Sequence, residues 1–321
     1  MERVRGGRLG RSLALFLVGF ALLDVVPGVA GLPFYLDEAL RRALAALAVA
    51  GLVALLGGAR SLAPRAAGLR TALREGAYPL GLAAGLCAFE LVSLVGAIRA
   101  GEAALSAAWA TDLLGMALLC AGVGAFEELL FRSLLMGGML SRFGDTRRGL
   151  LGSALASSVV FGLAHVSYAV GTADSLAMAQ MLLKTAQVTC VSLLLSGIFV
   201  RTRGVWGAAL VHGLSDLLLM VPLALVGGGE DLLGSYVTVG EGPGAELVGA
   251  VMVGVYVFAV LLYVPAAVRG WRLLSAADVP EPGPLCSAWE PRDAAPPTGR
   301  GPGDGRPVPP AGLMRQDRPP A

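Results

Sequence analysis

Long apolar stretches alternate with short polar connections along most of the chain. The hydrocarbon core of a bilayer is about 30 Å thick, so a helix that crosses it needs roughly 20 mainly apolar residues. Stretches of this length recur through the sequence and predict an all-α, polytopic membrane protein with about eight transmembrane helices. The predicted spans are residues 12–31, 43–63, 77–98, 108–131, 150–168, 177–200, 204–226 and 245–268.

Composition supports a membrane protein over a water-soluble enzyme. Apolar residues make up 55% of the 321 residues and charged residues 15%, with a mean hydropathy of +0.71, whereas about 25% of an ordinary soluble domain is charged. The net charge of +2 is too small to indicate a nucleic-acid partner. The four cysteines form no CxxC pair, so neither a disulfide framework nor a thiolate zinc site is indicated.

Arginine residues gather on alternate connections, which predicts the orientation in the membrane. The N-terminus, the connections after the second, fourth and sixth spans, and the exit from the last span are rich in arginine, while the other connections are mainly acidic. Because basic residues concentrate on the cytoplasmic side, both termini are expected there. Only Arg41, Arg42 and Arg99 run against this trend.

The same pattern predicts three regions. Residues 1–11 form a basic cytoplasmic N-terminus, residues 12–274 a transmembrane helical domain, and residues 275–321 a proline-rich, disordered cytoplasmic tail. The arginine-, glycine- and alanine-rich composition indicates a GC-rich bacterial genome. The expected location is therefore the cell inner (plasma) membrane, with the chain crossing it several times.

Ionisable residues inside a membrane helix are costly and need a partner or a cavity. The densest group of them lies in the string GAFEELLFRSLL, where Glu127 and Glu128 are followed by Arg132. Glu128 and Arg132 are four residues apart on one helical face, in the favourable acid-before-base order for a pair. Glu127 points about 100° away. One carboxylate is thus predicted to be held by the arginine and the other to be available for chemistry.

Both histidines of the chain, His165 and His212, also fall in predicted spans, and Asp216 follows His212 by one helical turn. Two imidazoles and two carboxylates are the groups that can activate a water molecule and stabilise an oxyanion. Two imidazoles and the carboxylate of Glu127 are equally a possible three-ligand zinc site. The residues alone leave both alternatives open.

The order EExxxR, FxxxH and HxxxD over polytopic helices resembles the CPBP family of intramembrane proteases (CAAX protease and bacteriocin-processing, or Abi), which includes the Ras-converting CAAX endopeptidases. The resemblance covers residues 108–226, about a third of the chain. The matching residues are Glu127, Glu128 and Arg132, then Phe161 and His165, then His212 and Asp216.

The resemblance implies an intramembrane endopeptidase that hydrolyses a peptide bond of a membrane-associated substrate. Glu127 and His165 would hold and activate the water, Glu128 fixed by Arg132 would orient the site, and His212 with residue 216 would stabilise the oxyanion. Family members have been described both as metalloproteases and as metal-free glutamate proteases, so zinc held by Glu127, His165 and His212 is possible. Many members carry asparagine where this chain has Asp216, and an ionised aspartate can only accept hydrogen bonds.

Residue counting raises one difficulty for this site. At 1.5 Å per residue, His212 lies about 12 Å and His165 about 22 Å from the cytoplasmic ends of their helices. The two rings can meet only if the fifth span starts outside the membrane, tilts or is broken. The cavity is expected to open toward the cytoplasm.

Other polar residues in the spans match no family motif. We interpret Asp24, Glu90, Asp112 and the chain's one lysine, Lys184, as packing or interfacial groups. Gly81 and Gly85 form a small-xxx-small pair of the kind that lets membrane helices pack closely.

Two other classes of function stay open. One is a non-catalytic membrane partner, such as a bacteriocin-immunity or regulatory protein, and the other is a proton-coupled transporter, although no internal repeat is visible. The partners are the lipid bilayer and a membrane-associated peptide or protein. The identity of that substrate, and whether it is lipidated, does not follow from the sequence.

Overall fold

The computed structural model describes residues 2–166, 175–227 and 244–279, and none of these residues lies in a β-strand. A helical element overlaps each predicted span, although the first two begin about ten residues earlier than predicted. In chain order the helical elements are α1 (Glu2–Val25), α2 (Phe34–Val53), η1 (Ala54–Gly58), η2 (Ala59–Leu62), α3 (Ala66–Glu75), α4 (Ala77–Ala100), α5 (Trp109–Glu128), η3 (Leu129–Met136), α6 (Gly137–Phe143), α7 (Arg147–Ala164), α8 (Ser175–Thr202), α9 (Val205–Val226) and α10 (Ala245–Ala276).

The protein is an all-α, multi-pass membrane protein. Within the described part of the chain, six helical segments are long and apolar enough to cross a membrane, so the predicted count of eight is not confirmed. They are Phe34–Leu62, Ala77–Ala100, Trp109–Phe143, Ser175–Thr202, Val205–Val226 and Glu246–Ala276.

The first and fifth predicted spans, which correspond to α1 and α7, are not among these six segments. In α1 the first half is rich in arginine, and the apolar part covers only residues 12–25. Helix α7 has 18 residues, including two arginines and three serines. Both helices fall short of the roughly 20 apolar residues that a span requires.

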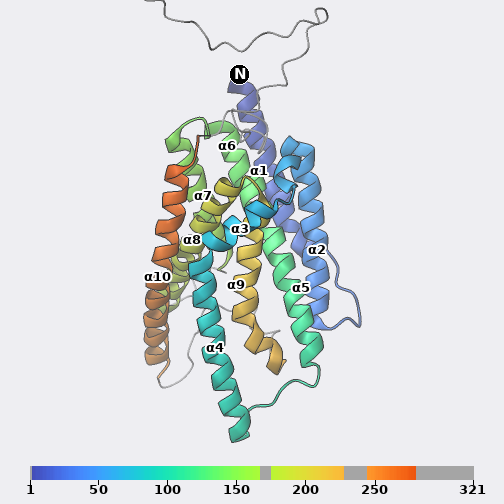
Figure 1. The fold of residues 1–321 in the computed structure, drawn as a ribbon, viewed down its shortest axis with the longest axis vertical. Helices are drawn as coiled ribbons and strands as arrows, with labels where there is room; N and C mark the ends of the chain where they lie inside the picture. The colour runs from blue at the N-terminus through green and yellow to red at the C-terminus, as the bar shows by residue number, and fades with distance from the viewer. Residues whose placement is uncertain (1, 167–174, 228–243, 280–321) are drawn as a thin grey trace, which may run out of the picture. The chain divides into compact units, whose positions relative to one another are not determined.

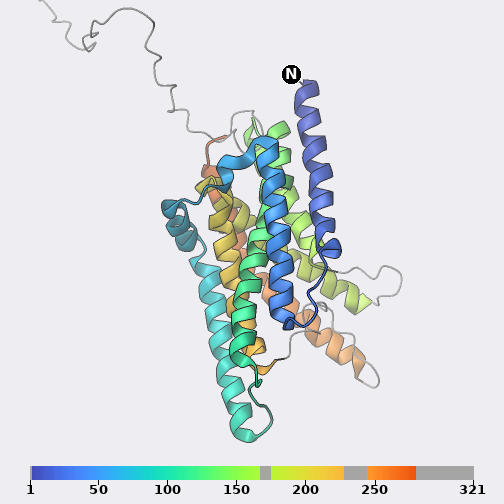
Figure 2. The ribbon, with the colours of Figure 1, turned by 90° about the vertical axis from the view of Figure 1, so that its right-hand side faces the viewer.

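Figure 1 shows that α1 begins and α10 ends at the same end of the helical bundle, where α6 also lies. The first turns of α1 extend beyond the other helices at this end, and the end of α4 extends beyond them at the other (Figure 2). The predicted tail lies largely outside the described residues, since α10 continues to Ala276 and the description stops at residue 279.

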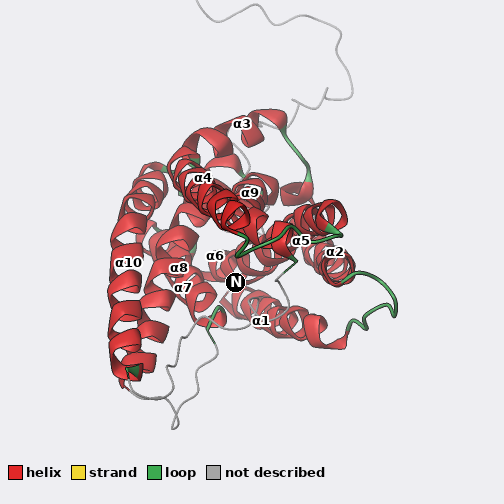
Figure 3. Cartoon of the chain, turned by 90° about the horizontal axis from the view of Figure 1, so that it is seen from below, coloured by secondary structure: helices red, strands yellow, loops and turns green. Residues whose placement is uncertain are grey.

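Helix α9 occupies the interior of the bundle. It packs against α5, α4, α3 and α8, while α2 covers α5 and α10 covers α8. The view along the helices shows α9 between α4, α5 and α8 (Figure 3). Elements on three sides of α9 can therefore direct side chains to one point.

The continuous helix from Trp109 to Phe143 forms the centre of the apolar core. Every residue of its middle part, the π-helix η3, is buried, and Leu130, Leu134 and Phe131 pack against α1, α2 and α7. Runs of π-helix are rare and often occur at functional sites. This one follows directly after Glu128.

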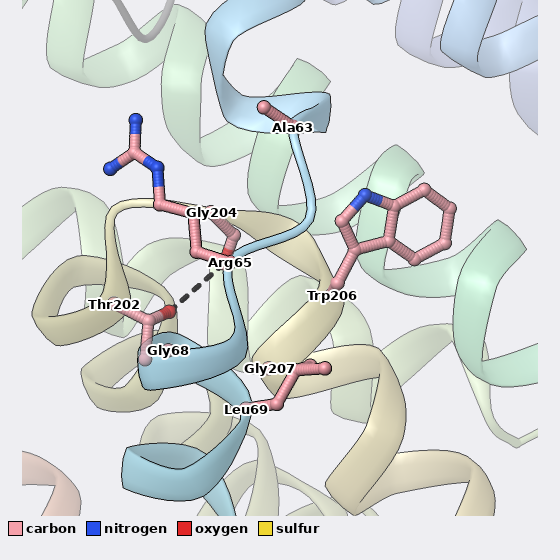
Figure 4. Close-up of a pocket in the computed structure, with 8 residues that line it drawn as sticks. All are labelled: Ala63, Arg65, Gly68, Leu69, Thr202, Gly204, Trp206 and Gly207. Carbon is pink, nitrogen blue, oxygen red and sulfur yellow. Dashed lines mark hydrogen bonds between the residues drawn. The ribbon is translucent and has the colours of Figure 1, made fainter.

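The turn between α8 and α9 is fixed by polar contacts. The Thr202 hydroxyl donates to the Gly204 carbonyl at 3.1 Å, drawn as the dashed line in Figure 4, and the Trp206 indole donates to the Leu62 carbonyl at 2.6 Å. A hollow beside this turn has a volume of about 10 Å³, room for about one water molecule. This turn sets where α9 begins, and hence the level of His212.

Candidate active site

Two glycines bring α5 and α9 into close contact at the site. A methyl group at Gly124 would lie 2.6 Å from the Ala209 carbonyl oxygen, and one at Gly213 would lie 2.7 Å from the Cys120 carbonyl oxygen. The neighbouring atoms are backbone, which cannot move aside. Small residues at these two positions therefore permit an approach that places His212 beside the acidic pair at the end of α5.

Glu128 and Arg132 form the predicted ion pair. Arg132 Nε donates to Glu128 Oε2 at 2.9 Å, and its Nη2 donates to Oε1 at 3.3 Å. Both side chains are fully buried. The guanidinium also lies over the Phe161 ring, 4.9 Å from its centroid, an arrangement in which the ring face attracts the positive charge.

Glu128 holds His212 as well. The Nδ1 atom of His212 lies 3.1 Å from Glu128 Oε1, and its Nε2 atom lies 3.3 Å from Asp216 Oδ2 and 3.8 Å from Glu127 Oε2. A carboxylate oxygen only accepts hydrogen bonds, so Nδ1 donates to Glu128. The ring is thus fixed between residues of α5 and its own helix.

His165 approaches Glu127 from another element. Its Nδ1 atom donates to the Phe161 carbonyl at 2.8 Å, and its Nε2 atom lies 3.5 Å from Glu127 Oε2. His165 terminates α7, which begins at Arg147 and ends at Ala164, four residues before the predicted end of that span. Both imidazoles therefore reach the same carboxylate oxygen, His165 at 3.5 Å and His212 at 3.8 Å, despite their different counted depths.

One carboxylate oxygen of Glu127, Oε2, is buried without a hydrogen-bond partner among the described residues. The side chain is 21% exposed and lines a cavity of about 490 Å³, a size typical of a ligand site. The position next to Oε2 can therefore receive a polar group from the cavity.

The structure thus brings all six predicted site residues into one cluster. Four of them line the cavity, namely Glu127, His165, His212 and Asp216. Glu128 and Arg132 are fully buried, and Glu128 contacts His212. Phe161, which the FxxxH motif contains, supplies a carbonyl to His165 and a ring face to Arg132.

The zinc alternative stays a prediction. Its three candidate ligands lie close together, since Nε2 of His165 and Nε2 of His212 are 3.5 Å and 3.8 Å from Glu127 Oε2. Among the described residues, however, no group of three or more His, Cys, Asp or Glu side chains is arranged to hold a metal ion.

The structure adds charged residues that the motifs did not indicate. Glu38 and Arg42 of α2 and Lys184 of α8 line the same cavity. Arg42 lies 3.6 Å from Glu38. The sequence did contain one indication of a special role for Arg42, because this arginine runs against the general charge pattern of the connections. Lys184 was interpreted as a packing or interfacial group, and its place in the cavity revises that interpretation.

The remaining polar residues do not join the site. Asp112 accepts a hydrogen bond from the Ser106 hydroxyl at 2.9 Å, which agrees with a packing role. Glu90 is exposed on α4 and does not line the cavity.

The site thus combines a buried, paired acid, a second acid that faces a cavity, and two histidines around it, in a bundle of membrane helices. Residues 109–218 match the family of type II CAAX prenyl endopeptidase Rce1-like proteins. The match confirms the family that the motifs predict, and it covers all six site residues. Comparisons with curated proteins and with solved structures give no match.

Proposed function

We propose that the protein is an intramembrane endopeptidase that hydrolyses a peptide bond of a membrane-associated substrate with a water molecule activated by Glu127. The observation that carries the proposal is the buried Oε2 atom of Glu127, which has no hydrogen-bond partner among the described residues and lies 3.5 Å from His165 Nε2. A water molecule there can donate one hydrogen bond to the carboxylate while the imidazole holds it in place.

The proposed reaction needs no other base. Glu127 takes a proton from the water as its oxygen forms a bond to the substrate carbonyl carbon, and the carbonyl electrons move onto the carbonyl oxygen. His212, which carries a proton on the nitrogen facing the cavity, stabilises this oxyanion. When the C–N bond breaks, Glu127 returns its proton to the leaving nitrogen. The products are a carboxylic acid and an amine, and transfer of the acid proton to the amine gives a carboxylate and an ammonium group.

Glu128 and Arg132 have a positioning role in this proposal. The arginine holds Glu128, and Glu128 accepts the Nδ1 proton of His212, so the opposite nitrogen is directed at the cavity. No step of the proposed reaction passes through a metal ion.

We also propose that the arginine-rich end of the bundle faces the cytoplasm and that the protein lies in the inner (plasma) membrane of a bacterium. Support comes from the charge pattern and from the common end at which α1 begins and α10 ends. The cavity is proposed to open on that side, and the substrate is proposed to reach it there.

Membrane proteomics followed by reconstitution tests the proposed function. Membranes from cells that express the wild-type chain, Glu127→Ala or His165→Ala are compared for peptides with new termini. Candidates are then presented as membrane-tethered peptides to the purified protein. Cleavage by the wild type alone is expected, whereas full cleavage by both variants would overturn the proposal and favour a non-catalytic membrane partner.

A further inference from the structure

Lys184, the one lysine in the sequence, lies on the face of α8 that borders the catalytic cavity. The cavity-lining residues of this helix include Lys184, Gln187, Val188 and Val191. Their spacing of three, four and seven residues is that of a single helical face. The lysine is therefore directed toward the cavity by the register of the whole helix.

Close packing of α7 on α8 sets the level of this lysine. A methyl group at Gly162 would lie 2.6 Å from the Thr185 carbonyl oxygen and 2.4 Å from the Thr189 hydroxyl. Gly162 precedes His165 by three residues, and Thr185 directly follows Lys184. The packing contact thus places Lys184 at the level where α7 ends and the site begins.

Asp216, an acidic residue, borders from α9 the same cavity that the basic Lys184 borders from α8. Its side chain is 35% exposed, whereas His212 beside it is 9% exposed. Asp216 is thus a carboxylate that faces the cavity where the proposed reaction develops negative charge.

An ionised carboxylate at this position opposes an oxyanion. It can accept the proton on His212 Nε2, 3.3 Å away, but it cannot donate to the substrate. An asparagine at the same position would supply an N–H donor and carry no charge. In a chain with aspartate here, a cation and a second donor beside His212 would offset the unfavourable charge.

We infer that Lys184 and Asp216 act as a pair in catalysis, in which Lys184 offsets the charge of Asp216 and donates a hydrogen bond to the oxyanion of the tetrahedral intermediate. The inference rests on the proposed function and extends it to a residue outside the family motifs. Asp216 then serves to orient His212, and the lysine ammonium supplies a second donor beside that of His212.

A double-mutant cycle tests this pair with the membrane-tethered reporter peptide that the wild-type chain cleaves. Lys184→Met should lower kcat by about 10²-fold or more, the usual effect of losing one oxyanion donor, with little change in KM. Lys184→Arg should retain more activity than Lys184→Met. In Asp216→Asn the amide supplies the donor, so adding Lys184→Met to it should cost less than about tenfold.

Arg148→Met is the matched control, because it removes one positive charge from an exposed position outside the cavity. Its kcat should equal that of the wild type. The inference is overturned if Lys184→Met cleaves within threefold of the wild type, or if the loss is the same with aspartate and asparagine at position 216.

Failure of the proposed function gives a different result. In that case the wild type does not cleave, or Glu127→Gln cleaves as well as the wild type, whatever residue stands at position 184. Melting temperatures of all variants in the same detergent identify any that fail to fold. Should Lys184→Met not fold, Lys184→Gln takes its place, with the same expected loss of kcat and the same rescue by Asp216→Asn.

Discussion

The Nδ1 atom of His212 lies 3.1 Å from Oε1 of Glu128, and this carboxylate is held in turn by Arg132. The contact joins α9 to the end of α5 inside the bundle. The two adjacent glutamates therefore differ in their surroundings. Glu128 contacts Arg132 and His212, whereas Glu127 faces the cavity.

Removing one member of the buried pair should destabilise the protein strongly. Glu128→Gln leaves the fully buried Arg132 charge without its partner, and Arg132→Met leaves the carboxylate without its own. Each change should lower the free energy of unfolding by about 3–5 kcal/mol. The double variant should lose less than the sum of the two, as measured by thermal unfolding in detergent. Additive losses would show that the two charges do not interact.

The contact between α5 and α9 should depend on its glycines. Gly213→Ala introduces a methyl group 2.7 Å from a backbone oxygen, and such overpacking costs about 1–3 kcal/mol. Because His212 is the adjacent residue, peptide cleavage should fall as well.

Gly85→Ala is the control for that substitution. A methyl group at Gly85 meets no atom within 4 Å, so alanine should leave the melting temperature unchanged or raise it slightly. Equal effects of the two substitutions would contradict the close approach of α5 and α9.

Glu75 should make stability depend on pH. Burial acts to raise the pKa of Glu75, but the side-chain hydrogen bonds from Arg269 and Arg74 outweigh it, so the pKa is lower than in the unfolded chain. Arg269 Nε donates to Oε2 of Glu75 at 2.7 Å, which links α3 to α10.

A carboxyl group whose pKa is depressed on folding stabilises the protein above its unfolded pKa, about 4.3, and loses this effect as the pH falls through its folded pKa. Glu75→Gln should therefore lower the free energy of unfolding by about 1–3 kcal/mol at pH 7, and by less near pH 3. Melting curves from pH 7 to pH 3 check this. An effect of Glu75→Gln that does not shrink on acidification would be contrary to expectation.

Peptide cleavage should not require a metal ion. Since the proposed step activates water with Glu127 alone, dialysis against 1,10-phenanthroline should leave the cleavage rate unchanged, and elemental analysis of the active protein should find far less than one zinc per chain. Loss of activity on chelation, with recovery on adding zinc, would refute the metal-free proposal.

Hydropathy was enough to place the helices, because a bilayer demands long apolar stretches. The prediction missed α3, since a ten-residue amphipathic helix carries no span signal, and it counted α1 and α7 as spans although their apolar parts are short. It also predicted a packing role for Gly81 and Gly85, which have open space around them.

The ion pair of the site could be predicted because Glu128 and Arg132 share a helix, where spacing fixes geometry. Contacts between residues of different helices could not be predicted from spacing within one helix. Whether His165 reaches Glu127 depends on how α7 packs against α5, and whether Lys184 borders the cavity depends on the register of α8 against α7. Both follow from tertiary packing, which no local pattern encodes.

The single-turnover rate of cleavage by Glu127→Gln tests the central claim most directly. Glutamine keeps the size of the side chain and removes its capacity to take a proton. Glu90→Gln is the control, because it makes the same chemical change at an exposed residue outside the cavity. The account predicts a loss of about 10²–10⁴-fold for Glu127→Gln, with an unchanged melting temperature and no loss for the control. A Glu127→Gln rate within a few fold of the wild type would contradict it.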